Sequence, residues 1–131
     1  SYQKAGYIQN IARFALEDDL SKDYIDGLND TDALAHLTRI KGVGRWTAEM
    51  ILMFSLGRPD VFPVDDLIIR NAMILIYDVK SEKKQLYKDL EEIALTWGPY
   101  RTYACLILWD WYEGQVKGRA LYGTEGITPQ Q

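Results

Sequence analysis

Residues 37–50 read LTRIKGVGRWTAEM, and this stretch decides the fold that the sequence predicts. It has the pattern of one helix ending, a tight turn at Gly42, Val43 and Gly44, and a second helix beginning. The two glycines allow the backbone to bend where a Cβ atom would clash. Amides of the turn and of the next helical turn then point outward, and such a helix start binds anions, phosphate above all.

The charges of the chain are unevenly distributed. The formal net charge is −4, whereas nucleic-acid-binding proteins are usually basic. Acidic side chains crowd residues 17–32, but Arg39, Lys41 and Arg45, which flank the turn, are all basic. A molecule polarised in this way can repel DNA with one face and bind it with another.

Apolar residues recur at helical spacing along almost the whole chain, so we expect an all-α class, arranged as a compact helical array. The predicted helices cover residues 2–16, 24–28, 46–56, 65–77 and 86–97, with a last helix beginning at Gly98-Pro99. A further helix, capped by Asn29 or Asp30, is predicted to run through Ala33, Leu34 and Leu37 into the turn. The helix over 65–77 is apolar nearly all round and should be central. We assign residues 1–114 to the helical domain and 115–131 to a loosely ordered tail.

The chain has only one cysteine and one histidine, which limits the kinds of site that it can contain. One cysteine, Cys105, excludes a disulfide framework and an iron–sulphur cluster held by four cysteines. No apolar run is long enough to span a bilayer, and no signal-peptide pattern opens the chain, so an intracellular location is expected. The lone His36 is expected at a helix surface rather than in a site.

The acidic pair Asp65-Asp66 follows a proline-bent loop and opens the predicted central helix. Such a pair is usually structural, because one carboxylate caps the first amides and both favour the helix dipole. For Asp65 the capping role is the better interpretation. For Asp66 we favour a chemical role, because a phosphate-binding turn and an acid on adjacent packed helices would face the same strand of nucleic acid.

Three stretches occur in the order of a known family: LTRIKGVGRWTAEMI, DVFPVDDLIIR and GPYRTYACLILWDWYEG. They resemble the helix-hairpin-helix (HhH-GPD) DNA glycosylase superfamily, most closely the 3-methyladenine DNA glycosylase II type. The resemblance implies a monofunctional DNA glycosylase of base excision repair. Such an enzyme flips alkylated purines out of double-stranded DNA and hydrolyses their N-glycosidic bond.

The resemblance also implies roles for individual residues. It makes Asp66 the catalytic acid, with Asp65 as second choice because other branches carry a single aspartate after Pro-Val. Trp46 and Trp109 would line the base pocket; an ordinary core role is as well supported for Trp109 and less so for Trp46. Glycosylases that also cut the strand use a lysine at the position of Trp46, so no lyase activity is expected.

The helix-hairpin-helix is expected to hold the DNA backbone, and its contact residues are Gly42, Val43, Gly44, Arg45 and Thr47. No cofactor is required, but the resemblance implies a sodium or potassium ion held by backbone carbonyls of Thr38, Ile40 and Gly42. In the third matching stretch, Arg101 is expected to form a structural ion pair and Tyr103 to lie in the core.

Members of this family are longer, and their first helices precede the equivalent of residue 1. The sequence therefore resembles the C-terminal part of a family member, and an exposed half-cleft favours a homo-oligomer or a partner that supplies the N-terminal half. A second function stays open: a non-catalytic module that binds DNA structure through the hairpin alone. The expected location is the cytoplasm and nucleoid, or the nucleus.

Overall fold

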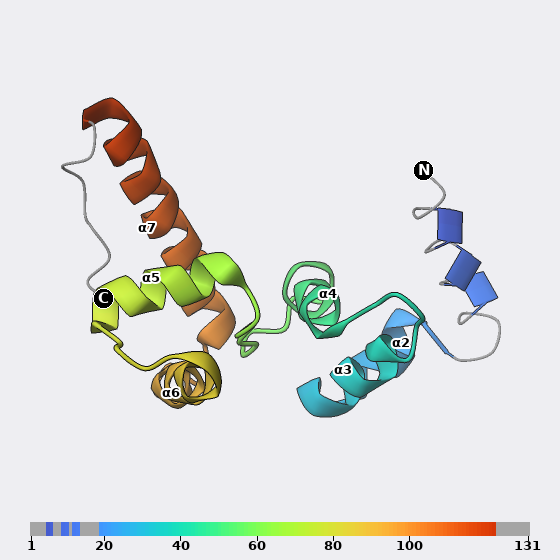
Figure 1. Ribbon diagram of the computed structural model, residues 1–131. Coiled ribbons are helices and arrows are strands. Elements are labelled where there is room, and N and C mark those ends of the chain that lie inside the picture. Colours follow the sequence, from blue (N-terminus) through green and yellow to red (C-terminus); the bar gives the residue numbers. More distant parts are fainter. Residues whose placement is uncertain (1–4, 7–8, 11, 14–18, 123–131) are drawn as a thin grey trace. The chain divides into compact units, whose positions relative to one another are not determined.

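The computed structural model describes residues 5–6, 9–10, 12–13 and 19–122 (Figure 1). Within these ranges the regular structure is helical and contains no β-strand, which confirms the all-α prediction. The chain divides into two compact units, Ser1–Arg58 and Pro59–Gln131, so the expected domain over 1–114 spans both. Most of the helix predicted over 2–16 lies outside the described residues.

The first unit contains α2 (Lys22–Asp26), α3 (Asp30–Thr38), α4 (Arg45–Met50) and the π-helix η1 (Ile51–Ser55), which continues α4. Helices α2 and α3 each have an N-cap side chain. The Ser21 hydroxyl accepts a hydrogen bond from the Tyr24 N–H at 3.2 Å, and Asn29 Oδ1 accepts one from the Asp32 N–H at 2.7 Å. α3 packs against α4 and η1. The core of this unit is made of Ile25, Ala33, Leu37, Ile40, Ala48, Leu52 and Met53.

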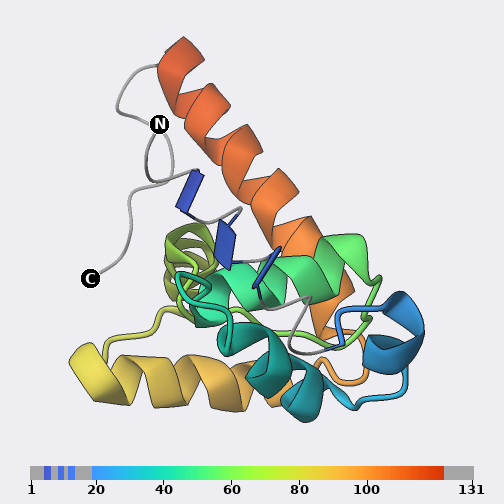
Figure 2. The same ribbon diagram turned by 90° about the vertical axis from the view of Figure 1, so that its right-hand side faces the viewer.

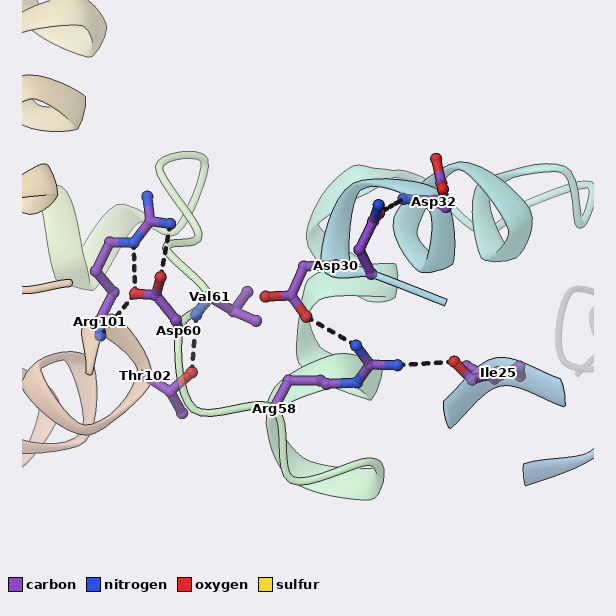
Figure 3. Close-up of polar contacts among 9 residues, drawn as sticks. Ile25, Asp30, Asp32, Arg58, Asp60, Val61, Arg101 and Thr102 are labelled. Atoms are coloured by element: carbon purple, nitrogen blue, oxygen red, sulfur yellow. Dashed lines mark hydrogen bonds and ion pairs between the residues drawn. The ribbon is translucent and has the colours of Figure 1, made fainter. Parts of the chain in front are cut away.

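Two polar residues are fixed within the first unit. Arg58, at its end, donates to Asp30 Oδ1 at 3.1 Å and to the Ile25 carbonyl oxygen at 2.7 Å (Figure 3). His36 is buried rather than at the surface, because its Nε2 is hydrogen-bonded to the Asp19 carbonyl oxygen at 2.7 Å. The surface position expected for His36 is therefore wrong: a backbone partner satisfies its ring inside the protein.

The second unit contains α5 (Leu67–Tyr77), α6 (Lys83–Leu95) and α7 (Arg101–Tyr122). α5 packs against α7, and both views show the C-terminal half of α7 extending beyond α5 (Figures 1 and 2). The core is formed by the loop before α5 and one face of each helix: Val61, Phe62, Pro63, Val64, Ile69, Ala72, Met73, Leu90, Ala94, Cys105 and Leu108.

Three expectations about this unit need correction. Helix α5 is not covered all round, since Leu67 and Ile76 are 58% and 47% exposed. Tyr103 is 52% exposed and not in the core, because it lies two positions, or about 200°, from the buried Cys105 on α7. Helix α7 continues past Gly114 to Tyr122, well into the range assigned to a tail. A glycine within a helix costs only about 1 kcal/mol, and the Glu113–Lys117 pair, 2.9 Å apart, spans it.

None of the described helices combines the length and the apolar composition that crossing a membrane requires.

Candidate functional site

The turn between α3 and α4 has the geometry that its glycines predict. The Val43 N–H donates to the Ile40 carbonyl oxygen at 2.9 Å, which closes the turn. Gly42 has a φ of 94°, a conformation that residues with a Cβ rarely adopt. Gly44 is the N-cap residue of α4 and gives the helix no side-chain hydrogen bond. Because no cap side chain covers the first turn of α4, an anion can approach its amides.

The surroundings of this turn are exposed and basic. Arg39, Lys41, Arg45 and Thr47 are exposed, and 45% of the Trp46 surface is accessible. Asn10 holds the turn from the preceding segment, because its Nδ2 donates to the Lys41 carbonyl oxygen at 2.8 Å. The residues expected to contact the DNA backbone are thus exposed on the surface of the first unit, except Val43, which is partly buried.

Asp66, and not Asp65, caps helix α5. Its Oδ2 accepts a hydrogen bond from the Ile69 N–H at 3.0 Å, and the Trp109 Nε1–H donates to the same oxygen, also at 3.0 Å. Asp66 is buried, with 9% of its surface exposed, whereas Asp65 is exposed. The capping role expected for Asp65 is wrong, because the last extended residue before the helix is Asp66 and its side chain turns back over the third helical amide.

The segment that leads to Asp66 is buried and internally bonded. Val61, Phe62, Pro63 and Val64 each expose less than a tenth of their surface. The Asp66 N–H donates to the Pro63 carbonyl oxygen at 2.9 Å, and Arg70 Nη1 donates to the Val64 carbonyl oxygen at 3.1 Å. A carboxylate carried by such a segment has a fixed position, which a catalytic group requires.

A cavity of about 350 Å³ that is widely open to solvent lies beside Trp109. Its lining residues are Ile68, Trp109, Tyr112, Glu113 and Val116. Trp109 thus forms part of the cavity wall and also donates a hydrogen bond to Asp66. Aromatic faces attract a planar cationic group, and a carboxylate next to them stabilises positive charge that develops nearby.

The structure brings together two of the residues that the sequence singled out, Asp66 and Trp109. Trp46 and the hairpin residues belong to the first unit. Tyr112, Glu113 and Val116 were missed, although their spacing from Trp109 is that of one helical face. The predicted ion pair of Arg101 is confirmed: its Nε lies 2.7 Å from Asp60 Oδ1. In the part of the chain that the structure describes, no three His, Cys, Asp or Glu side chains form a group that could hold a metal ion.

Comparison with known proteins finds relatives of one kind, although no protein-family model matches the chain. The chain is 41% identical over 91 residues to DNA-3-methyladenine glycosylase 1 of Schizosaccharomyces pombe. The matched region covers 68% of this chain and 38% of that protein. The crystal structure of a DNA-3-methyladenine glycosidase from Bacillus halodurans superposes with a TM-score of 0.73 at 35% identity, covering 86% of this chain and 51% of that one.

A second similar solved structure contains nucleic acid. It is a 3-methyladenine DNA glycosylase of Schizosaccharomyces pombe in complex with abasic DNA, with a TM-score of 0.58 and 39% identity over 67% of this chain and 42% of that one. The chain therefore spans about half or less of the length of these relatives. Over most of its own length, the chain is a homologue of the 3-methyladenine DNA glycosylases of the helix-hairpin-helix (HhH-GPD) family.

Proposed function

We propose that this chain carries the catalytic part of a monofunctional DNA glycosylase that removes alkylated purines of the 3-methyladenine type from double-stranded DNA. The observation that carries this proposal is the hydrogen bond between the Asp66 carboxylate and Trp109, whose side chain also lines an apolar cavity. The names of the homologues support the substrate class, and the relative solved with abasic DNA supports duplex DNA as partner.

The chemistry follows from the properties of an alkylated purine. A base inside a duplex is out of reach, so the nucleotide rotates out of the stack into a pocket. Alkylation at N3 or N7 makes the purine cationic, and an indole face such as that of Trp109 attracts that charge. The same charge makes the base a good leaving group, so the protein's main task is to stabilise the cation that develops on the sugar.

Asp66 performs that task. A fixed carboxylate near C1′ stabilises the developing positive charge, and it can also orient or deprotonate the attacking water. The Ile69 amide and the Trp109 indole hold the Oδ2 atom, so the carboxylate needs no rearrangement as the glycosidic bond breaks. Trp46 stands where strand-cutting relatives have a lysine, so the reaction ends with base release and an intact strand.

The hairpin binds the phosphates of the DNA backbone. Backbone amides at Gly42, Val43 and Gly44 and the first turn of α4 hydrogen-bond to phosphate oxygens, and Arg45 and Thr47 add side-chain contacts. We also propose a sodium or potassium ion at this turn, held by the carbonyl oxygens of Thr38, Ile40 and Gly42. The Ile40 oxygen already accepts from Val43, but a carbonyl oxygen has two lone pairs and can serve both.

A base-release assay tests the proposal. Duplexes containing 7-methylguanine are incubated with the wild-type chain, with Asp66→Asn and with Asp65→Asn, and free base and duplex binding are measured. Asp66→Asn retains a cap oxygen for Ile69 but loses the charge, so we expect base release to fall about 10²–10³-fold with duplex binding retained. Asp65→Asn, at the exposed neighbour, is the matched variant; loss of release in this variant alone would make Asp65 the catalytic acid.

The second candidate function is a non-catalytic module that recognises DNA structure. Two observations favour it: the hairpin lies in a compact unit of its own, and the net charge of −4 is unusual for a nucleic-acid enzyme. Duplex binding without any release of free base by the wild-type chain would support this module and end the enzyme proposal for the chain.

A further inference from the structure

Residues 59–66 form the loop that ends at Asp66, and its first part is bonded to the start of α7. The Arg101 guanidinium grips the Asp60 carboxylate with two bonds, Nε to Oδ1 at 2.7 Å and Nη2 to Oδ2 at 3.1 Å (Figure 3). The Arg101 backbone N–H donates to Oδ1 as well, at 3.2 Å. Asp60 therefore binds both the side chain and the first amide of α7, in the two-pronged geometry that gives arginine–carboxylate pairs their directionality.

Thr102 adds two bonds that involve the loop backbone. Its Oγ1 accepts from the Val61 N–H at 3.0 Å (Figure 3). Its own N–H donates to the Pro59 carbonyl oxygen, also at 3.0 Å. Thr102 is buried, with 5% of its surface exposed, so water competes little for these bonds. The backbone at 59–61 is thus held in one register against the first turn of α7.

The other end of the loop is bonded to the same helix. Asp66 accepts from Trp109, which follows Thr102 by almost exactly two helical turns and so lies on the same face of α7. The face between them is buried at Cys105 and Leu108. The loop therefore runs along one stripe of α7, with polar bonds at its start and at its end.

We propose that Asp60 and Arg101 are positioning residues for Asp66: by fixing the start of the loop on α7, they set where its final carboxylate meets Trp109, one of the residues that line the cavity. This role rests on the proposed function for its effect on catalysis. Neither residue lines the cavity, and the bonds between Asp60 and Arg101 join the loop to the start of α7. Each side chain is about a quarter exposed. Their influence therefore passes through the loop.

The electrostatics of the pair fit this role. The side-chain hydrogen bond from Arg101 holds the pKa of Asp60 below its ordinary value, and the backbone hydrogen bond and charge of Arg101 act in the same direction against the cost of burial. Asp60 is therefore charged at neutral pH, and the bonds that fix the loop are charge-assisted. Replacing the carboxylate by an amide weakens them without removing the shape of the side chain.

The test compares Asp60→Asn with Asp78→Asn in the 131-residue chain. Asp78 forms an ion pair of its own with Lys80, at 2.6 Å, in the same unit, and it occupies a left-handed conformation that asparagine also tolerates. The first readout is the NMR signal of the Trp109 indole N–H, identified by its disappearance in Trp109→Phe. The second is the single-turnover rate of 7-methylguanine release together with duplex affinity.

We expect Asp60→Asn to shift the Trp109 indole signal and to speed its exchange with solvent, although residue 60 is remote from Trp109 in the chain. Base release should fall up to about 10²-fold while duplex affinity stays unchanged, because a small displacement of a catalytic group affects the chemical step. Arg101→Lys keeps the charge but loses the planar fork, so it should shift the same signal by less. Asp78→Asn should change neither readout.

A merely structural ion pair gives a different result. If Asp60→Asn lowers the melting temperature but leaves the Trp109 signal at its wild-type position, the positioning role is overturned. If Asp60→Asn does not fold, the Arg101→Lys signal decides in the same way. A wild-type chain that releases no base contradicts the proposed function alone, because the indole signal still reports whether Asp60 and Arg101 set the position of Asp66.

Discussion

The two units of this chain present their candidate functional groups in opposite ways. In the first unit they are backbone amides on an exposed glycine turn, where Gly44 adds no cap side chain. In the second unit the central group is the side chain of Asp66, which exposes 9% of its surface and shares one oxygen between Ile69 and Trp109. The first arrangement depends on local backbone conformation, and the second on bonds between segments far apart in the chain.

This contrast has a physical basis in what each part would do to DNA. A phosphate is already charged and solvated, so it can be gripped at the surface by amides that need only point outward. A developing sugar cation exists only briefly, and a carboxylate stabilises it well only when held in place and shielded from water. We therefore expect the two units to respond differently to substitution.

The largest effect is expected from Trp109→Phe. The substitution keeps an aromatic ring in the cavity wall but removes the Nε1–H that donates to Asp66. Hydrogen bonds to charged groups contribute about 1.5–3 kcal/mol, so we expect the free energy of unfolding to fall by about that amount and base release to fall with it. Chemical denaturation and the single-turnover assay measure the two quantities.

Trp111→Phe is the matched control for this prediction. Trp111 lies on the same helix two positions away, so it faces another direction and is absent from the cavity lining. Equal losses in the two variants would mean that aromatic volume on α7, and not the bond to Asp66, is what matters. In that case the contrast between the units would not rest on a side-chain network.

A smaller effect is expected from Gly42→Ala, compared with Gly44→Ala. With a φ of 94° at Gly42, a Cβ costs about 1–2 kcal/mol or displaces the turn, and either result weakens the grip on phosphate. Gly44 has a φ of −85°, and an added Cβ there meets no atom within 4 Å, so alanine is tolerated. Duplex affinity and thermal stability should therefore fall for Gly42→Ala and hardly change for Gly44→Ala.

The same two variants can also contradict the view that the first unit binds DNA through the backbone conformation of its turn. If Gly44→Ala weakens duplex binding as much as Gly42→Ala, then space over the α4 amides, rather than backbone conformation, limits binding. If neither variant affects duplex binding, the exposed turn is not the DNA-binding surface.

The helices were largely predictable because their signals are local. Asn29 does cap α3, the pair at 65–66 does open α5, and Gly57 follows the helix that begins after the turn. The errors had two causes, a tertiary contact in one case and the continuity of a long helix in the other. The burial of His36 depends on a carbonyl seventeen positions earlier, and the extension of α7 past Gly114 depends on the rest of a long helix.

The candidate site was predictable in its parts but not in its connections. Asp66 and Trp109 could be singled out from motifs, yet nothing in the spacing showed that they are bonded to each other, 43 positions apart. Arg101 was expected to form an ion pair, but its partner Asp60 lies 41 positions earlier, in another of the matching stretches, and nothing in either stretch showed that the two residues pair. Such partners follow from packing, which a single sequence encodes only indirectly.

The smallest expected effect is on the free energy of unfolding at acidic pH. Asp60 has a pKa held below its ordinary value, chiefly by the Arg101 hydrogen bond, so the folded state binds fewer protons at this site than the unfolded state. The pair therefore stabilises the protein fully above the ordinary aspartate pKa, and this contribution is lost as the pH falls through the lowered value. Because both side chains are about a quarter exposed, we expect less than about 1 kcal/mol.

Denaturation of wild type and Asp60→Asn across an acidic pH series measures this contribution. The variant should be less stable at neutral pH, and the two curves should converge as the pH falls, because the wild-type carboxylate becomes neutral like the amide. The depressed pKa values of Asp19 and Asp89 affect both proteins equally and cancel in the difference. A difference independent of pH would mean that Asp60 acts through shape alone, and the second unit would then depend on local geometry as the hairpin does.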